Sequence, residues 1–222
     1  MNTDRITIVR RAAAAEREIA AHIVAAGRAA FARSGRFTVA VSAALLDESL
    51  VATLAAAPIA DERFWRVTRL FLADTWLPES VVLWRHLRAA ASGLPLASGA
   101  AHFEAPCGVS AVASANASEQ ELRATFTLTA GELPRFDLCL LALGADGQIG
   151  GLAPGGRAHD EIGRLVVADF VPALGRAVIT LTPPVIQNAL TIVAIAVAPD
   201  LISPTHPFRR NRAPASRGPA RA

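Results

Sequence analysis

The residues of this chain that could do chemistry gather in a glycine-rich run at residues 143–155, LGADGQIGGLAPG. Glycines let a backbone approach a ligand closely and turn its N–H groups toward it. Within the run, the Asp146 carboxylate and the Gln148 amide could hold a water molecule or a hydroxyl group. An ordinary flexible loop has a similar composition. The run is therefore either a ligand-binding turn or a plain loop, and the sequence leaves both readings open.

A proton acceptor for such a site must come from elsewhere, because an amide does not act as a base at neutral pH. His159, which Asp160 follows, is the histidine nearest after the run. A neighbouring carboxylate can orient an imidazole for proton transfer. A solvent-exposed loop histidine is the alternative. No set of His, Cys, Asp and Glu has metal-ligand spacing, so we expect neither a metal nor another cofactor.

The elements that would position these residues alternate along the chain. Apolar runs predict strands at residues 5–9, 37–41, 67–72, 136–143, 165–167, 177–181 and 191–198. Helical spacing and end signals predict helices at residues 12–34, from after Ala44 through Leu54, and at residues 80–91, and a turn or short helix at Pro183 and Pro184. Residues 118–128 fit either a helix that opens with a capping box or an alternating strand.

This alternation favours an α/β fold with a mainly parallel sheet and helices on both of its faces. Ligands bind such sheets beyond the carboxyl ends of the strands. We therefore expect the site to be formed by the loops that follow the strands at residues 37–41, 67–72 and 136–143.

Composition excludes several chemistries. Hydrophobic residues make up 52% of the chain and charged residues 18%, which favours a packed globular domain over disorder. All 22 basic residues are arginine, and there is no tyrosine, so a Schiff-base lysine, a P-loop lysine and a catalytic tyrosine are all excluded. No apolar run reaches membrane-spanning length, and the alanine-rich stretch near the N-terminus carries Glu16, Arg17 and Glu18. We therefore expect a cytoplasmic protein without a membrane partner.

The C-terminal segment differs from the rest of the chain. No acidic residue follows Asp200, whereas five arginines do, among prolines and alanines. We expect one domain over residues 1–201 and a disordered basic tail over residues 202–222. A basic tail could contact a nucleic acid, but no aromatic platform or recognition helix accompanies it, so we expect no nucleic-acid partner.

The strand FDLCLL at residues 136–141 and the glycine-rich run together resemble a signature of 6-phosphogluconolactonases, F-D-L-x-L-L followed by G-x-G-x-D-G-H-x-x-S-L-F-P-G. The resemblance implies a 6-phosphogluconolactonase-like fold. In that family the His of this motif is understood to activate water against a sugar lactone. Asp146 and Gly147 match the motif, and Gln148 stands where the family has His. Loss of a general base costs roughly 10²–10⁴-fold in rate unless another group, such as His159, substitutes for it.

Three further segments carry the resemblance. FTVAVSAALLD at residues 37–47 resembles F-T-L-A-L-S-G-G-S-T-P, a loop understood to cradle the substrate phosphate. Here alanines replace both glycines and Asp47 adds a negative charge. VTRLFLADTWLP at residues 67–78 resembles V-H-x-F-x-G-D-E-R-x-V-P, without the arginine. AVITLTPPVIQN at residues 177–188 resembles R-I-T-L-T-x-P-x-L-N. The resemblance implies substrate-binding residues at Ala43, Ala44, Asp74, Gly147 and Arg176. Arg157 is a further candidate for substrate binding.

The resemblance implies a protein of sugar-phosphate metabolism, in the pentose phosphate pathway. The altered motifs favour a diverged member with weak or lost lactone hydrolase activity. If lactone hydrolysis persists, Gln148 and Asp146 would hold the water, and His159 would assist. The alternatives are a non-catalytic protein that acts through a protein partner and a relative of the amino-sugar-phosphate isomerases and deaminases. A sugar-phosphate ligand and a protein are thus the candidate partners.

Overall fold

The computed structural model describes residues 12–56, 58–77, 96–97, 100–102, 110–144 and 146–196. The strand expected at residues 5–9, the helix expected at residues 80–91 and the tail expected at residues 202–222 lie outside these residues. The expected domain boundary at residue 201 lies outside them as well.

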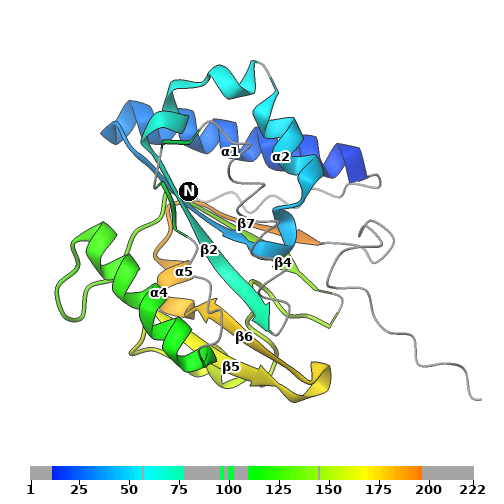
Figure 1. The fold of residues 1–222 in the computed structure, drawn as a ribbon, viewed down its shortest axis with the longest axis vertical. Helices are drawn as coiled ribbons and strands as arrows, with labels where there is room; N and C mark the ends of the chain where they lie inside the picture. Colours follow the sequence, from blue (N-terminus) through cyan, green and yellow to red (C-terminus); the bar gives the residue numbers. More distant parts are fainter. Residues whose placement is uncertain are drawn as a thin grey trace, which may run out of the picture.

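Seven strands of the described chain form one sheet, in the order β5-β6-β2-β1-β4-β7, with β3 also paired to β2 (Figure 1). Their bounds are β1 Phe37–Ser42, β2 Thr68–Leu77, β3 Ala101–His102, β4 Leu138–Leu143, β5 Val166–Val171, β6 Arg176–Leu181 and β7 Ile192–Ala196. The strands β3, β2, β1, β4 and β7 pair in parallel, whereas β5 and β6 form an antiparallel hairpin that joins β2 in antiparallel orientation. The prediction of a mainly parallel sheet is confirmed. The hairpin departs from it, because a connection as short as Pro172–Gly175 allows only antiparallel pairing.

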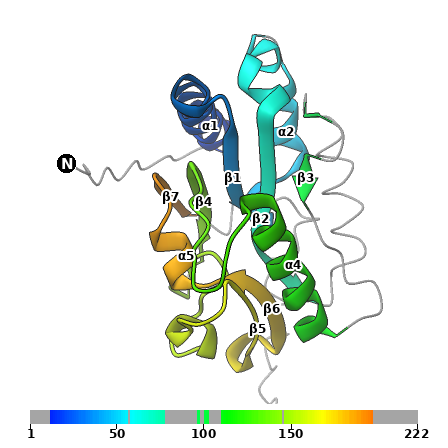
Figure 2. The ribbon, with the colours of Figure 1, turned by 90° about the vertical axis from the view of Figure 1, so that its left-hand side faces the viewer.

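Helices cover both faces of the sheet, as the alternation predicted (Figure 2). They are α1 Ala12–Ser34, α2 Glu48–Ala55, α4 Ala111–Phe126 and α5 Pro183–Gln187. Residues from α1 and α2 share one buried apolar cluster with β1, and residues from α4 and α5 share a second cluster with the other face. The core therefore consists of two layers, one on each side of the sheet, and the two layers meet different faces of β2.

Helix α1 has the bounds that its sequence predicts. Ile19, Ile23 and Ala30 are buried, whereas Phe31 is 37% exposed. Gly35 follows with a φ of +66°, a conformation that glycine adopts without strain, and its N–H donates to the carbonyl of Phe31. This glycine ends the helix and turns the chain toward β1.

The ambiguous segment at residues 118–128 belongs mostly to helix α4. The helix begins earlier than a capping box at Ser118 would place it, because the Ser110 hydroxyl accepts the Ala113 N–H and caps the N-terminus. Its buried Glu119 accepts hydrogen bonds from Arg164 Nε at 2.7 Å and from the Leu165 N–H at 3.1 Å. These contacts fix the middle of α4 to the start of β5, and thereby place the helix over the β2–β6 pair.

Candidate functional site

Strand β2 is longer than its sequence indicates, and this moves part of the expected site. We expected the strand to end at residue 72 and a loop to follow it. Instead β2 continues to Leu77, because antiparallel pairing with β6 from Asp74↔Thr180 to Leu77↔Ala177 extends it beyond the end of β1. Asp74 and Thr75 therefore lie within the sheet.

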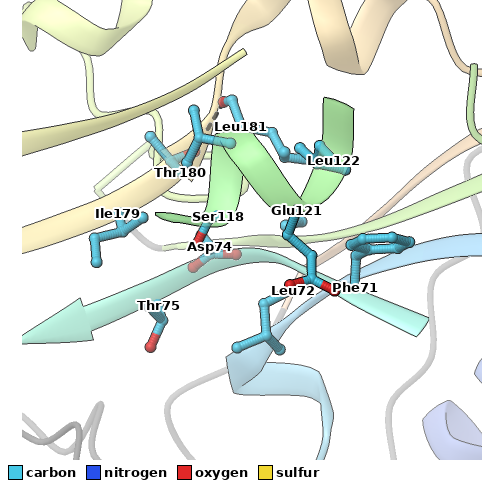
Figure 3. Close-up of a pocket in the computed structure, with 12 residues that line it drawn as sticks. Phe71, Leu72, Asp74, Thr75, Ser118, Glu121, Leu122, Ile179, Thr180 and Leu181 are labelled. Carbon is cyan, nitrogen blue, oxygen red and sulfur yellow. Dashed lines mark hydrogen bonds between the residues drawn. The ribbon is translucent and has the colours of Figure 1, made fainter. Parts of the chain in front are cut away.

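A β-bulge in β2 decides which way Asp74 points. Val41 pairs with Leu72, but the next residue of β1, Ser42, pairs with Asp74, so Ala73 is an extra residue on β2. A bulge of this kind shifts the alternation of side chains by one position and re-aims the residue that follows it. Figure 3 shows the side chain of Asp74 on the side of β2 that Phe71 and α4 occupy. Leu72 and Thr75 point to the other side of the strand.

Asp74 is a buried carboxyl group with an incomplete set of partners. Its side chain is 3% exposed. The Ser42 hydroxyl and the Trp76 indole donate hydrogen bonds to it, yet its Oδ1 has no hydrogen-bond partner among the described residues. Burial raises the pKa of Asp74 from 3.8 to about 6, and the two hydrogen bonds oppose this rise. A carboxyl group with a pKa near neutrality at the carboxyl end of parallel strands is a functional-site candidate on physical grounds.

The glycine-rich run is an ordered turn that packs onto Asp74. The Thr180 hydroxyl donates to the Gly150 carbonyl at 2.7 Å, and the Gly150 N–H donates to the Ala142 carbonyl at 2.9 Å. Gly151 has a φ of +78°, and a Cβ at this position would lie 2.8 Å from the Asp74 Cβ. The turn can approach the strand this closely only because residue 151 is glycine.

Gln148 is folded into this turn. Its side chain is 6% exposed and lies over Gly144, where a Cβ would come within 2.7 Å of the Gln148 Cγ. Its carbonyl accepts the Gly144 N–H at 2.8 Å, and its N–H donates to the Asp146 carboxylate at 3.3 Å. Its Oε1 is buried without a hydrogen-bond partner among the described residues. This amide oxygen can accept a hydrogen bond from a bound water or hydroxyl, but it cannot take a proton.

Two of the expected site residues beside Gln148 are exposed. Asp146 and Gly147 lie on the surface of the turn, Gly147 with a φ of +82°. The Asp146 carboxylate serves the turn itself, because it accepts the N–H of Gln148. The structure thus gives Asp146 a local structural role, and its contact with a ligand stays a prediction.

The expected substitute base lies in a short 3₁₀ helix, Arg157–Asp160, that contacts β5 and α5. Arg157, His159 and Asp160 are all exposed. Among the residues that the structure describes, no hydrogen bond or ion pair joins His159 to Asp160 or to Gln148. The orienting contact that we expected from Asp160 is therefore not formed, and a catalytic role of His159 or a binding role of Arg157 stays a prediction.

The segment that resembles a phosphate cradle is turned into the core. Ala43, Ala44, Leu45 and Leu46 are each 9% exposed or less, and three of them pack in the apolar cluster beneath α1 and α2. The Asp47 carboxylate caps α2 and accepts the Leu50 N–H at 2.7 Å. A carboxylate thus occupies the helix N-terminus, where a phosphate would gain most from the N–H groups and the helix dipole.

Arg176, at the start of β6, lies with its guanidinium carbon 5.6 Å from the centre of the Trp76 ring. Trp76 in turn donates to Asp74. The structure therefore brings Asp74, the glycine-rich turn and the Arg176–Trp76 pair together at the carboxyl end of β2. It does not connect His159 to this group by a hydrogen bond or ion pair among the described residues.

Sequence reasoning missed several residues of this site, namely Ser42, Trp76, Ser118, Glu121 and Thr180. Ser118 and Glu121 of α4 line a small cavity together with Asp74 (Figure 3). The signal for this site was a charged residue, Asp74, inside the otherwise apolar run LFLADTWL. A buried charge is costly and needs either partners or a function.

The comparisons with known proteins agree with this geometry. Residues 10–200 match the family model described as glucosamine-6-phosphate isomerases/6-phosphogluconolactonase. The fold and the glycine-rich turn at the carboxyl end of its sheet define the class as an α/β protein of 6-phosphogluconolactonase-like fold. The chain belongs to the glucosamine-6-phosphate isomerase/6-phosphogluconolactonase family.

Solved structures show the same fold at low sequence identity. A 6-phosphogluconolactonase from Trypanosoma cruzi is 20% identical with a TM-score of 0.67, and the match covers 89% of this chain and 82% of that one. The enzyme from Leishmania guyanensis is 19% identical with a TM-score of 0.67, covering 87% and 81%. The enzyme from Trypanosoma brucei is 19% identical with a TM-score of 0.66, covering 87% and 82%. No match was found among curated protein sequences.

Among the described residues, no helix is both long and apolar enough to cross a membrane. The same residues contain no group of three or more His, Cys, Asp or Glu side chains that could hold a metal ion.

The raised pKa of Asp74 predicts a pH-dependent stability. Between about pH 4 and pH 6 the folded protein holds this proton more tightly than the unfolded chain, so stability falls as the pH rises and the loss is complete above about pH 6. The size of this effect is on the order of 2–3 kcal/mol. We expect the unfolding free energy of Asp74→Asn, relative to the parent, to rise by this amount between pH 4 and pH 7 in urea titrations.

The exposed Asp61 offers a matched control for that measurement. Asp61→Asn should show the same difference from the parent at both pH values. If the difference in unfolding free energy between Asp74→Asn and the parent were also the same at both pH values, the pKa of Asp74 would not be raised by folding.

Proposed function

We propose that this chain is a diverged member of its family in which hydrolysis of phosphorylated sugar lactones is weak or lost. The observation that carries this proposal is Gln148, which stands where the family motif has His and is buried in the turn beside Gly144. A neutral imidazole accepts a proton from water near neutral pH, whereas an amide does not. The chain therefore lacks, at this position, the group that would make water a nucleophile.

The state of the expected phosphate loop supports the same proposal. A phosphate cradle needs backbone N–H groups that are open to the ligand, together with hydroxyl donors. Here the four side chains at residues 43–46 are buried and apolar, and the Asp47 carboxylate accepts a backbone N–H at the start of α2. A dianionic phosphate placed there would meet a negative charge.

The contrast between the core and the site loops favours a role in binding. The sheet, its two apolar layers and the ordered glycine-rich turn are intact, whereas the groups for proton transfer and phosphate binding are replaced. We propose a cytoplasmic protein of carbohydrate metabolism that acts mainly by binding, with a protein as the second candidate partner beside a small ligand.

A binding measurement tests the loss of the phosphate site. We expect 6-phosphogluconate, titrated to several millimolar at pH 7.5, to leave the Tm of the chain unchanged, because a ligand that binds only the native state would raise it by mass action. Asp47→Ser keeps a helix cap and removes the negative charge. The same titration on this variant therefore distinguishes the effect of the Asp47 charge on phosphate binding from the effect of the buried side chains of the loop. A saturable rise in the Tm of the parent chain would show that phosphate is still bound and would overturn this part of the proposal.

A further inference from the structure

Exposed arginines gather at the edge of the sheet that lies opposite the candidate site. Because β1, β2 and β4 run in parallel, their amino ends meet at one edge of the sheet and their carboxyl ends at the other (Figure 1). The glycine-rich turn follows β4 at the carboxyl edge, roughly 17–20 Å away along the strand. The arginine edge consists of five exposed residues that precede or begin these strands, Arg36, Arg63, Arg66, Arg69 and Arg135.

The pairing of the strands sets three of these arginines side by side. β1 and β2 pair from their first residues, and the Asp137 N–H, just before β4, donates to the Thr38 carbonyl of β1 at 2.9 Å. Arg36, Arg66 and Arg135 therefore stand at the starts of three adjacent strands. Adjacent strands lie about 4.8 Å apart, so one extended segment that crosses the edge can reach all three guanidinium groups.

The charge of the arginine edge is not neutralised within the described part of the chain. Glu62 and Asp137, the acids nearest to it, are each paired with an arginine of α1. The five arginines of the edge form no ion pair among the described residues. Two exposed acids, Asp61 and Glu132, also precede these strands. Five positive and two negative charges leave this edge with a net charge of +3.

Two partly exposed apolar side chains lie beside these arginines. Phe31, in the last turn of α1, is 37% exposed, and Leu133, two residues before Arg135, is 38% exposed. Protein–protein interfaces are enriched in arginine and aromatic side chains, and a large apolar side chain near the centre often carries much of the binding energy. The arginine edge thus offers a partner both positive charge and apolar contact.

We propose that the arginine edge binds an extended acidic segment of a partner protein, whose carboxylates pair with the arginines and one of whose apolar side chains packs against Phe31. The inference rests on the proposed function, because it names the chemistry of the protein partner proposed there. A planar guanidinium binds a carboxylate through two parallel hydrogen bonds. Side chains on one face of an extended segment repeat about every 7 Å, a spacing that the long arginine side chains of neighbouring strands can follow.

A nucleic acid matches this edge less well. Its phosphates repeat at every nucleotide, so some of them would meet the exposed carboxylates of Asp61 and Glu132. Single strands also gain affinity by stacking their bases on several aromatic rings. Phe64 and Trp65 are buried, so Phe31 is the one exposed aromatic side chain near these arginines in the part of the chain that the structure describes. A peptide carries carboxylates only where its sequence has them, and it supplies the apolar side chain.

The test measures the binding of four labelled probes to the full chain by fluorescence anisotropy, at low and at high salt. The first probe is a short peptide of glutamate, glycine and leucine. The second has glutamine in place of glutamate, the third has serine in place of leucine, and the fourth is an oligothymidine of equal charge. We expect saturable, salt-sensitive binding of the first peptide, weaker binding of the third and of the oligothymidine, and none of the second.

Matched variants separate the arginine edge from the basic C-terminal segment. The edge variant combines Arg36→Gln, Arg66→Gln and Arg135→Gln. The tail control, which removes the same charge, combines Arg209→Gln, Arg210→Gln and Arg212→Gln. An exposed pair contributes up to about fivefold in affinity, so we expect the edge variant to bind the first peptide about tenfold more weakly and the tail control to change binding less than about twofold.

Phe31→Ser tests the apolar contact. It should weaken binding of the leucine peptide by about threefold or more and leave the serine peptide unaffected, because only the former has a side chain to pack on the ring. Equal affinities of Phe31→Ser and the parent for the leucine peptide would overturn this contact.

Lactone hydrolysis, measured on the same proteins, keeps this inference apart from the proposed function. Rapid hydrolysis by a chain that binds the peptide would overturn the proposed function alone, since Gln148 lies at the opposite edge. The present inference is overturned if the first peptide does not bind saturably, if the glutamine peptide or the oligothymidine binds as tightly, or if the tail control loses as much affinity as the edge variant. If the edge variant does not fold, the four probes on the parent chain and the single variant Arg135→Gln decide.

Discussion

Gly151→Ala is expected to lower the free energy of unfolding by about 2–5 kcal/mol. Two costs add at this position. An L-residue in the left-handed region costs roughly 1–2 kcal/mol, and overpacking a tight contact costs a further 1–3 kcal/mol. Gly151 has a φ of +78°, and its added Cβ would lie 2.8 Å from Asp74 Cβ and 2.9 Å from Val178 Cγ2. Both neighbours are strand side chains in the sheet, so the turn itself must move.

Gly155 in the same run gives a matched control. It has a φ of +72°, but nothing lies within 4 Å of a Cβ built on it. Gly155→Ala should therefore cost only the roughly 1–2 kcal/mol of the backbone conformation. Urea unfolding of the two variants measures the difference directly. Equal losses of unfolding free energy in the two variants would mean that the glycine-rich turn does not pack onto Asp74 in solution.

The positions of most strands, and their alternation with helices along the chain, could be predicted from the sequence. Most core strands are apolar runs bounded by turn residues. The bounds of α1 follow in the same way from its periodicity and from Gly35. The sequence could not decide helix α4, because apolar residues also alternate over residues 122–128 as they would in a strand. What decides it is a contact 45 residues away in the sequence, between Glu119 and Arg164.

The candidate site was less predictable, for the same reason. The length of β2 depends on β6, which pairs with it in antiparallel orientation from 100 or more residues downstream. The bulge at Ala73 is likewise a property of the β1–β2 pair. The motif resemblance located the glycine-rich turn and the substitution at Gln148. It could not show that Asp74 points to α4 and that burial raises the pKa of this carboxyl group to about 6.

A second prediction concerns the rate of lactone hydrolysis. A general base is worth roughly 10²–10⁴-fold, and positioning of the substrate can be worth as much again. The chain lacks the base at Gln148 and, in our account, the phosphate loop at residues 43–47. Gln148→His returns a proton acceptor but leaves the phosphate without partners. We therefore expect this substitution to raise the rate of lactone hydrolysis less than about tenfold.

A gain of several orders of magnitude in Gln148→His would show that the substrate is still held correctly. In that case the buried, apolar conformation of residues 43–46 would not be the one that meets the ligand. A gain below tenfold, together with an unchanged Tm in 6-phosphogluconate, would place the loss in both the base and the phosphate loop.

The most direct measurement of the central claim is the rate at which the purified parent chain hydrolyses 6-phosphogluconolactone, compared with the spontaneous rate in the same buffer at pH 7. We expect a rate little above the spontaneous one, because Gln148 cannot take the proton of the attacking water. Saturable turnover at an ordinary enzymatic rate, roughly 1–10³ per second, would contradict it.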